Sequence, residues 1–417
     1  MGHHAMTHIF LSSRMNQESM LTASDSKTGI ELADLFEAYA DCRANKRGTI
    51  NALAFELDYE QELLQLRDEI NSCTYSPGRS IAFIVDKPVK REIFAADFRD
   101  RVVHHLIINK LNPIFEKSFI YDSYACRKGR GTHFGIKRID RFIRQCSQNY
   151  TKDCYVLKLD IQGFFMAIDK RILWGLLNKL ITEQHHQGDQ NTLLGLCYKI
   201  ISNNPTKNCI IKSGKKKWRD LPPDKSLFHS APGCGLPIGN LTSQIFANVY
   251  LNVLDHFIKH DLGARYYGRY VDDFILVHQS HSHLKSSLTK ITDFLKKDLH
   301  LTLHPRKIHL QHFNKGVPFL GVVIRPNHIQ GGRRIKGNFY DSIQKDNQAV
   351  KNHKPSIGER AAFLCSINSY LGILKHYQTY RLRKRLLIKH LSIWWWNLAY
   401  FSGGCAKLTL KQRRARF

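Results

Sequence analysis

The sequence predicts an α+β fold, and three observations support this prediction. The chain has 417 residues, of which 43% are hydrophobic, enough for two or three packed subdomains with their own cores. From residue 154 onward, strand-like and helix-like segments follow in the order strand, helix, helix, strand, strand, helix, strand, which favours a sheet covered by helices on one face. In residues 265–279, "RYYGRYVDDFILVHQ", β-branched and aromatic residues flank two adjacent aspartates, as expected of two strands joined by a tight turn.

The first third of the chain is predicted to be helical apart from one hairpin. The opening "MGHHAMTHIF" lacks the apolar core of a signal peptide, so we interpret it as a disordered leader. Residues 29–75 carry apolar side chains at helical spacing. Residues 80–96 predict a hairpin, with its turn near Lys87 and Pro88. Residues 100–116 and 131–146 predict amphipathic helices joined by the basic loop "ACRKGRG".

The rest of the chain supplies the predicted sheet and a basic helical end. Strands are expected at 154–165, 301–310 and 317–324, and helices at 169–181, 241–260 and 283–299. Residues 203–226 predict a basic, proline-containing loop. The last 75 or so residues predict basic helices. Their aromatic run "SIWWWNLAYF" is interpreted as the docking face of one helix.

The charge of the chain points to a polyanionic partner. Lys and Arg number 63 against 35 Asp and Glu, giving a net charge of +28, which favours nucleic acid. No segment approaches the roughly 18 consecutive apolar residues of a membrane span, so we expect no membrane association. The ten cysteines are scattered without a C-x-x-C pair, which is typical of reduced thiols in the cytoplasm.

Three carboxylates are the candidate catalytic groups. Asp272 and Asp273 lie among apolar strand residues, where burying two charges costs free energy unless something compensates them. Asp160 ends another apolar strand, which a sheet of this order can place beside the turn. Such a cluster suits two Mg²⁺ ions, which prefer oxygen ligands and can activate a 3′-hydroxyl and stabilise a pyrophosphate leaving group. The alternative is that the aspartates only cap a hairpin turn, where Asp is common.

These residues belong to segments that resemble the motifs of reverse transcriptases. The segments are "LKLDIQGFF", "YVDD", "LTLHPRK" and "PFLG", and the resemblance runs from about residue 80 to residue 324 and on into the C-terminal helices. It implies a right-hand polymerase fold with fingers, a palm that carries the Tyr-x-Asp-Asp hairpin, and a helical thumb. The implied boundaries are a leader and helical extension at 1–75, fingers at 76–150, a palm at 151–325 with a basic loop at 203–230, and a basic thumb at 326–417.

The resemblance also implies roles for single residues. The catalytic set is Asp160, Asp272 and Asp273, and together with Ile161 these residues would bind two Mg²⁺ ions, for which Mn²⁺ can substitute. The implied nucleotide-binding residues are Lys87, Arg91, Arg127, Phe165, Ile238, Gly239, Gln244 and Lys307, and the implied primer grip is Phe319, Leu320 and Gly321. Phe165 would exclude a ribose 2′-hydroxyl. Ordinary core packing of that ring, and solvation of each single basic residue, are the alternatives.

One segment departs from the family pattern. In "LPIGNLTSQ", Ile238 stands where most members have glutamine, and Gln244 stands where proline is usual. This departure resembles reverse transcriptases of diversity-generating retroelements and of the related antiphage defence systems. Replacing an amide by an aliphatic side chain removes a hydrogen-bonding group, which would loosen base selection.

The implied partners follow from the same resemblance. They are a structured non-coding RNA template, a DNA or RNA primer with its cDNA, deoxynucleoside triphosphates, and a small accessory protein or a second copy of the chain. Two other functions stay open at this point. One is a template-independent or protein-primed nucleotidyl transferase, and the other is a non-catalytic, maturase-like RNA-binding protein.

Overall fold

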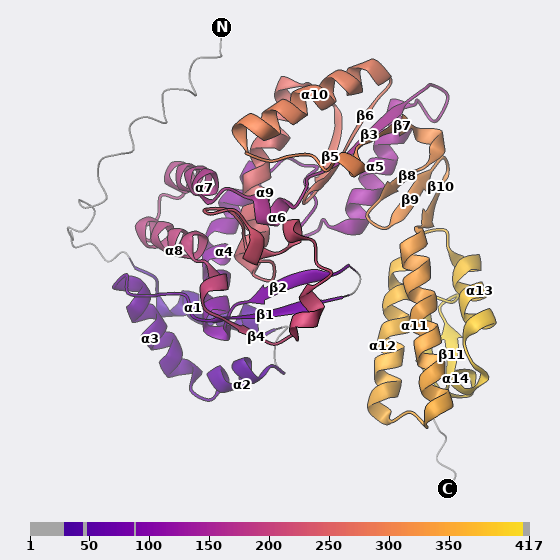
Figure 1. Ribbon diagram of the computed structural model, residues 1–417, viewed down its shortest axis with the longest axis horizontal. Helices are drawn as coiled ribbons and strands as arrows, with labels where there is room; N and C mark the ends of the chain where they lie inside the picture. The colour runs from indigo at the N-terminus through magenta and orange to yellow at the C-terminus, as the bar shows by residue number, and fades with distance from the viewer. Residues whose placement is uncertain (1–28, 45–47, 87–88, 412–417) are drawn as a thin grey trace.

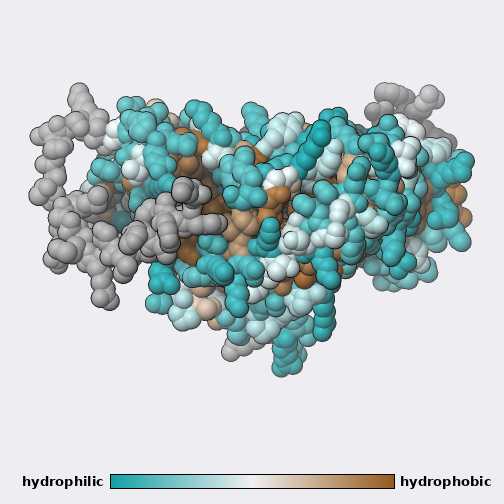
Figure 2. Space-filling view, turned by 90° about the horizontal axis from the view of Figure 1, so that it is seen from above, coloured by the Kyte–Doolittle hydropathy of each residue, from teal (hydrophilic) through white to brown (hydrophobic). Residues whose placement is uncertain are grey.

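The computed structural model describes residues 29–44, 48–86 and 89–411. Figure 1 shows a main body that contains the larger sheets, with a separate, mainly helical lobe formed by the C-terminal part of the chain. The leader predicted at the N-terminus lies outside the described residues, and so does Lys87. On the face of the molecule seen in Figure 2, hydrophilic residues predominate and hydrophobic residues show between them near the middle.

The N-terminal helices pack against one long helix of the main body. Leu35, Leu63 and Leu66 are fully buried at helical spacing, which confirms the predicted periodicity. The bounds of this group are α1 Leu32–Arg43, α2 Ile50–Glu56, α3 Tyr59–Asn71 and α4 Phe98–Ser118.

A three-stranded sheet follows the N-terminal helices. Strands β1 (Ser80–Val85) and β2 (Arg91–Ala95) form the predicted antiparallel hairpin. Strand β4 (Cys209–Ile211) pairs in parallel with β1, although residues 203–226 were predicted to be a loop. The prediction was incomplete because three residues are too few to show strand periodicity in the sequence.

A buried glutamate fixes that basic segment to the same sheet. Glu92 on β2 is 1% exposed. It accepts hydrogen bonds from Trp218 Nε1 at 2.7 Å, Ser226 Oγ at 2.8 Å and the Leu227 amide at 2.6 Å. The segment is therefore attached to the β1–β2 hairpin both by the pairing of β4 with β1 and by the hydrogen bonds to Glu92.

The central sheet has four antiparallel strands in the order β5–β6–β3–β7. The strands are β3 Tyr155–Asp160, β5 Tyr266–Tyr270, β6 Asp273–His278 and β7 His309–His312. Because side chains alternate along a strand, Leu157 and Leu276 pack on one face of the sheet, and Val156 and Val277 pack on the other.

Both faces of this sheet are covered, which corrects the prediction of helices on one face. Helices on the Leu157 face include α7, α9 and α10, whereas α5 and a second small sheet pack on the Val156 face. The sequence could not show this second cover, because α5 precedes the sheet in the chain. The helices are α5 Thr132–Cys146, α6 Phe164–Ala167, α7 Lys170–Gln184, α8 Gln190–Ser202, α9 Leu241–His256 and α10 His281–Asp298.

The second small sheet replaces a strand that was predicted as continuous. Residues 317–324 form two strands, β8 (Val317–Phe319) and β9 (Val322–Arg325), and β10 (His328–Gly331) pairs with β9. The tight turn between β8 and β9 has φ of 46° at Leu320 and 87° at Gly321. Likewise, only the end of the strand predicted at 301–310 is extended, as the start of β7.

The C-terminal lobe has its own core. Helices α11 Arg333–Asn352, α12 Ile357–Leu374, α13 Tyr380–His390 and α14 Ile393–Leu398 confirm most of the predicted helical end. The ring of Trp395 stacks on Phe363 with 3.7 Å between centroids. The end of the aromatic run is not helical, since strands β11 (Ala399–Ser402) and β12 (Lys407–Leu410) form a hairpin there. No helix of the described residues is long and apolar enough to cross a membrane.

Candidate active site

The strand register brings the three aspartates to one edge of the central sheet. Asp160, the last residue of β3, is paired directly with Asp273, the first residue of β6. Asp272 lies in the turn just before Asp273, and its carbonyl accepts a hydrogen bond from the Ile161 amide at 3.3 Å. The end of β3 and the turn are thus joined, so the carboxylates that were predicted to cluster come together.

The aspartates of the turn are in an environment that disfavours negative charge. Burial and the charge of Asp160 raise the pKa of Asp272 to about 6. Burial raises the pKa of Asp273 to about 7, and the neighbouring Asp272 and Asp160 add to this while Lys158 opposes it. Because desolvation and like charges both favour the protonated form, a bound cation would stabilise the ionised pair.

Two lysines already contact the carboxylates. Lys307 Nζ lies 2.8 Å from Oδ1 and 2.9 Å from Oδ2 of Asp160. Lys158 Nζ lies 3.2 Å from Oδ2 of Asp273, whose Oδ1 is buried without a hydrogen-bond partner. Lys307 and Arg91 each lower the pKa of Asp272, so both cations lie close enough to act on that carboxylate.

The donor set fits Mg²⁺ when part of the coordination comes from substrate. Within the described residues, no group of three or more Asp, Glu, His or Cys side chains is arranged to hold a metal ion. Mg²⁺ is commonly bound by one or two carboxylates together with substrate phosphates, and not by an all-protein cage. Asp160 and Asp272 supply the two carboxylates, and a metal would have to displace Lys307 from both oxygens of Asp160. One oxygen of Asp273 is engaged by Lys158.

The predicted nucleotide-binding residues Phe165 and Ile238 lie in one small cluster with residues of the β1–β2 hairpin and of α6. Both rest, partly buried, against a core that includes Phe94 of β2. The Ile238 carbonyl accepts a hydrogen bond from the Phe94 amide at 2.8 Å. Gly239 has φ of 132°, and a Cβ at this position would lie 2.8 Å from the Phe94 carbonyl oxygen, so only glycine fits this close approach.

Gln244, near the start of α9, is exposed, and its Oε1 accepts a hydrogen bond from Cys126 Sγ at 3.1 Å. Its amide group is therefore near the loop that precedes α5.

Arg127, which the resemblance implies as a nucleotide-binding residue, is engaged inside the protein. Its side chain is 3% exposed and pairs with Glu116 at 2.8 Å. Nη1 donates to the carbonyls of Ile120 at 2.7 Å and Ser123 at 3.0 Å. A guanidinium with these partners anchors the loop before α5. The sequence could not reveal this, since Glu116 carries no distinguishing pattern.

The segment predicted as primer grip is divided between the core and the surface. Phe319 is 1% exposed and packs under the central sheet. Leu320 and Gly321 form the turn between β8 and β9, and a Cβ on Gly321 would lie 2.9 Å from Ile335 of the C-terminal lobe. The ring of Phe319 is thus unavailable to a primer, and the turn is the part that remains a candidate contact.

Two charged residues of the site were missed in the sequence. Lys158 lies two positions before Asp160, and this spacing alone places both side chains on the same face of β3. Arg269, two positions before Val271, is fully buried. An arginine inside an otherwise apolar strand signals a buried acidic partner, which here is Asp255.

Comparison with known proteins agrees with this geometry. Residues 87–324, more than half of the chain, match the family described as reverse transcriptase (RNA-dependent DNA polymerase). This chain belongs to the reverse transcriptase family. The predicted right-hand polymerase fold and the predicted class of enzyme, an RNA-directed DNA polymerase, are thereby confirmed.

The chain is also similar to individual members of the family. It is 23% identical to Protein YkfC of Escherichia coli (strain K12), over 69% of this chain and 77% of that protein. It is 24% identical to the group II intron-encoded protein LtrA of Lactococcus lactis subsp. cremoris, over 53% of this chain and 32% of LtrA. It is 27% identical to nuclear intron maturase 1 of Arabidopsis thaliana, over 50% of this chain and 33% of the maturase. The chain thus spans only about a third of these two intron-type relatives.

Among solved structures, the chain is similar to a telomerase of Candida albicans in complex with a fragment of telomeric RNA. The TM-score is 0.43 at 11% identity, covering 80% of this chain and 61% of the telomerase.

Proposed function

We propose that this reverse transcriptase synthesises cDNA on an RNA template at the site formed by Asp160 and Asp272. The observation that supports the proposal best is the strand register, which pairs Asp160 with Asp273 and sets Asp272 beside the end of β3. Partly buried carboxylates next to the exposed cations Lys307 and Arg91, in a chain of net charge +28, suit a polyanionic substrate that brings its own phosphate ligands.

The residues have separate tasks in this proposal. Asp160, Asp272 and the Ile161 carbonyl would hold two Mg²⁺ ions, with Asp273 as an outer contributor and Mn²⁺ as a substitute metal. When bound, these ions favour ionisation of the primer 3′-hydroxyl and stabilise the leaving pyrophosphate. The 3′-oxygen attacks the α-phosphorus of the nucleotide, the bond to pyrophosphate breaks, and the hydroxyl proton passes to solvent.

The surrounding side chains bind and select the nucleotide. Lys307 and Arg91 neutralise charge that develops on the triphosphate. Phe165 packs under the sugar and leaves no room for a 2′-hydroxyl, and Ile238 and Gly239 line the same cluster. Gln244 is also proposed to contact the nucleotide, through its exposed amide on α9.

The domain boundaries are proposed on the same basis. Residues 76–150 form the fingers, 151–325 the palm and 326–417 the thumb, which would grip the template–primer duplex. The basic segment 203–230, numbered within the palm, is hydrogen-bonded to the β1–β2 hairpin and would move with the fingers.

We infer a structured non-coding RNA as the dedicated template, copied either for antiphage defence or for mutagenic retrohoming. The intron-encoded relatives support an RNA partner. The departure at Ile238 and Gln244 supports the retroelement or defence lineage. Sequencing of the cDNA, together with inspection of the neighbouring genes for a variable repeat or a defence island, separates the two roles.

Primer extension tests the catalytic proposal. Purified protein with Mg²⁺, labelled deoxynucleotides and its co-purified RNA is expected to extend a primer. Asp272→Asn is expected to abolish extension, because an amide cannot replace a charged metal ligand. RNA binding is expected to stay nearly intact, because Lys and Arg side chains elsewhere contact the phosphate backbone of the RNA. Asp293→Asn, on an exposed residue of α10, is the matched control. Extension by Asp272→Asn at the wild-type rate would overturn the site.

The same assay distinguishes the alternative functions. Product that forms equally after the RNA is digested would indicate a template-independent transferase. Product that stays covalently bound to protein would indicate protein priming. RNA binding without extension under any condition would indicate a maturase-like protein.

A further inference from the structure

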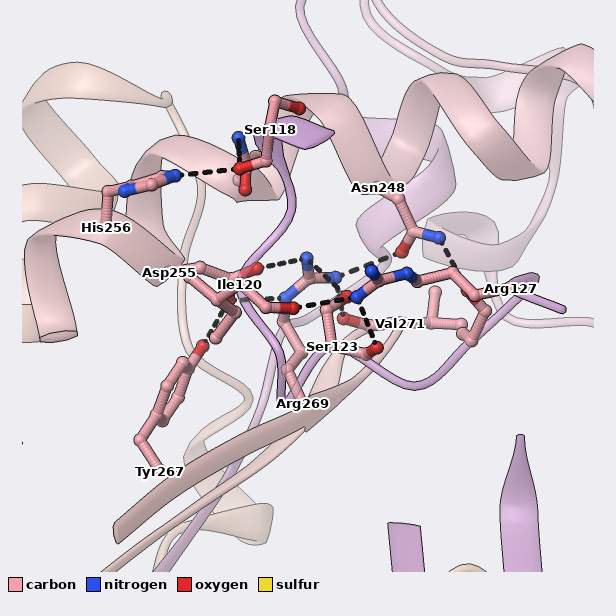
Figure 3. Close-up of polar contacts among 12 residues, drawn as sticks. Ser118, Ile120, Ser123, Arg127, Asn248, Asp255, His256, Tyr267, Arg269 and Val271 are labelled. Atoms are coloured by element: carbon pink, nitrogen blue, oxygen red, sulfur yellow. Dashed lines mark hydrogen bonds and ion pairs between the residues drawn. The ribbon is translucent and has the colours of Figure 1, made fainter. Parts of the chain in front are cut away.

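A buried arginine directly behind the catalytic turn has all five of its N–H groups bonded. Arg269 and its partner Asp255 are both fully buried. Nε donates to Asp255 Oδ1 at 2.7 Å and Nη2 to Asp255 Oδ2 at 2.5 Å. Nη1 donates to Asn248 Oδ1 at 3.2 Å and to the Val271 carbonyl at 3.0 Å, and Nη2 also donates to Ser123 Oγ at 3.4 Å. Figure 3 shows these side chains converging from α9, β5 and the loop before α5.

The anchor of Arg269 is itself fixed from a second direction. Tyr267, two residues earlier on β5, donates its hydroxyl to Asp255 Oδ1 at 2.6 Å. Asn248, one of the other acceptors, donates Nδ2 to the Ala125 carbonyl at 2.8 Å. The guanidinium is therefore held in one orientation by α9, and this orientation directs Nη1 at the turn.

The turn needs such support, because its backbone is strained. Val271 has φ of 56°. For a β-branched residue this conformation is a genuine outlier, and a residue held in a sparsely populated region costs on the order of 1–3 kcal/mol. The next carbonyl, of Asp272, accepts from the Ile161 amide. The two successive carbonyls of the turn are thus each fixed by a hydrogen bond, one from Arg269 and one from the end of β3.

We propose that Arg269 is a positioning residue for Asp272, which it holds in metal-binding geometry by donating to the Val271 carbonyl while Asp255 fixes its other edge. The inference rests on the proposed role of Asp272. A buried ion pair adds little stability over apolar side chains of the same size, so stability alone does not account for this one. A hydrogen-bond donor aimed at the Val271 carbonyl is what an apolar substitute could not supply.

The test measures metal binding on the full chain without turnover, by Mn²⁺ titration in electron paramagnetic resonance. Arg269→Lys retains a positive charge, but one ammonium group cannot reach Asp255, Asn248 and Val271 together. Loss of an outer-shell partner typically weakens metal affinity by about tenfold to a hundredfold, and we expect a decrease in that range. The extension rate is expected to fall with it and to recover in part at high Mn²⁺ concentration.

A matched control separates positioning from simple stability. Tyr267→Phe removes one bond to Asp255 and leaves all five bonds of Arg269 in place. This variant is expected to have a lower melting temperature with Mn²⁺ affinity unchanged. Mn²⁺ affinity of Arg269→Lys equal to that of Tyr267→Phe would overturn the proposal.

A second variant keeps the test decisive if Arg269→Lys does not fold. Asn248→Leu removes the acceptor that orients Nη1, and a smaller loss of Mn²⁺ affinity is expected, whereas unchanged affinity overturns the proposal. Asp272→Asn shows whether a failure lies in the proposed metal site at Asp272 or only in the positioning role of Arg269. If Asp272→Asn still binds Mn²⁺ like the wild type, the proposed metal site fails. If Asp272→Asn loses binding and Arg269→Lys does not, only the positioning role fails.

Discussion

Lys307 holds both carboxylate oxygens of Asp160, at 2.8 Å and 2.9 Å from its Nζ. The side chain of Lys307 is 48% exposed, whereas that of Asp160 is 14% exposed. The ammonium group therefore occupies the solvent side of a carboxylate that is proposed to bind metal. We infer that metal and triphosphate arrive together, with the metal replacing Lys307 on Asp160 and the lysine turning to the phosphates.

The first prediction concerns this exchange. In Lys307→Met, Mn²⁺ is expected to bind more tightly to the nucleotide-free protein, because a competing cation has been removed. A partly exposed ion pair contributes little, so the gain in affinity should be about twofold to fivefold. The KM for deoxynucleotides is expected to rise in the same variant, because a phosphate ligand is lost.

Lys315→Met, on an exposed residue beyond the other end of β7, is the control for this prediction. The measurements are Mn²⁺ titration and steady-state extension kinetics. Weaker Mn²⁺ binding in Lys307→Met would contradict the exchange, and an unchanged KM would remove Lys307 from the nucleotide site.

The second prediction is a pH dependence that originates at His104 on α4. This side chain is buried, and its Nδ1 lies 2.8 Å from Thr242 Oγ1 on α9. Burial, with smaller contributions from His105 and Arg101, lowers the pKa of His104 to about 3. The unfolded chain protonates this group near pH 6.5. Between these values the unfolded state holds more protons at this group, so the contribution of His104 to the free energy of unfolding falls as the pH drops from about 6.5 towards 3. The raised pKa values of Asp272 and Asp273 act in the opposite direction, so the effect is measured as a difference between the wild type and a His104 variant.

Urea unfolding at a series of pH values measures this effect. At its steepest, one group changes the free energy of unfolding by about 1.4 kcal/mol per pH unit. His104→Gln is expected to make the free energy of unfolding fall less, or rise more, than in the wild type as the pH drops below 6.5, whereas His229→Gln, on an exposed residue, should keep the wild-type slope. Equal slopes in both variants would show that His104 does not carry the pH dependence.

The parts of the fold that the sequence predicted are those built from local patterns. The β1–β2 hairpin, strand β3 and the turn at Asp272 carry their periodicity within a few residues. The position of the turn beside Asp160, at the end of β3, could be predicted from the order of strands and helices in the chain. The aspartate cluster was predictable because adjacent buried carboxylates in apolar strands need compensation.

The parts that were missed depend on partners far apart in the chain. Strand β4 is recognisable only by its pairing with β1, and Glu92 only by the tryptophan that donates to it. Arg127 looked like a free cation because its partner Glu116 belongs to a different element. A charged residue in sequence shows that a partner is needed, but the fold decides whether that partner is substrate or protein.

The third prediction concerns the proposed sugar gate. Phe165 packs partly exposed beside the buried Phe164, with 5.4 Å between ring centroids. Phe165→Ala is expected to admit ribonucleotides, lowering the preference for deoxynucleotides by about tenfold or more, which corresponds to about 1.4 kcal/mol. Phe164→Leu is the control, since it alters the core beneath and should lower the melting temperature without changing sugar selection. If Phe165→Ala keeps the wild-type preference for deoxynucleotides over ribonucleotides, the Phe165 ring only packs in the core and does not select the sugar.

The last prediction concerns Ile238, whose carbonyl is bonded to the Phe94 amide and whose side chain shares a cluster with Phe165. Because the backbone bond is independent of the side chain, Ile238→Gln should keep the segment in place and add a polar group near the proposed nucleotide. We expect the misincorporation spectrum to change more than the overall rate. A shift of about 1.4 kcal/mol in selection is roughly tenfold in the error ratio, which sequencing of cDNA resolves.

The competing interpretation of Ile238 is packing alone. In that case the glutamine amide would be buried without a partner and would lower stability by about 1–3 kcal/mol, slowing incorporation of all nucleotides alike. Measuring the error spectrum and the melting temperature of the same variant separates the two interpretations. Because Ile238 lies in the cluster with Phe165, the double variant with Phe165→Ala adds a further criterion. Effects on selection that are not additive would place both side chains at one nucleotide, whereas a lowered melting temperature with an unchanged spectrum would exclude a role for Ile238 in fidelity.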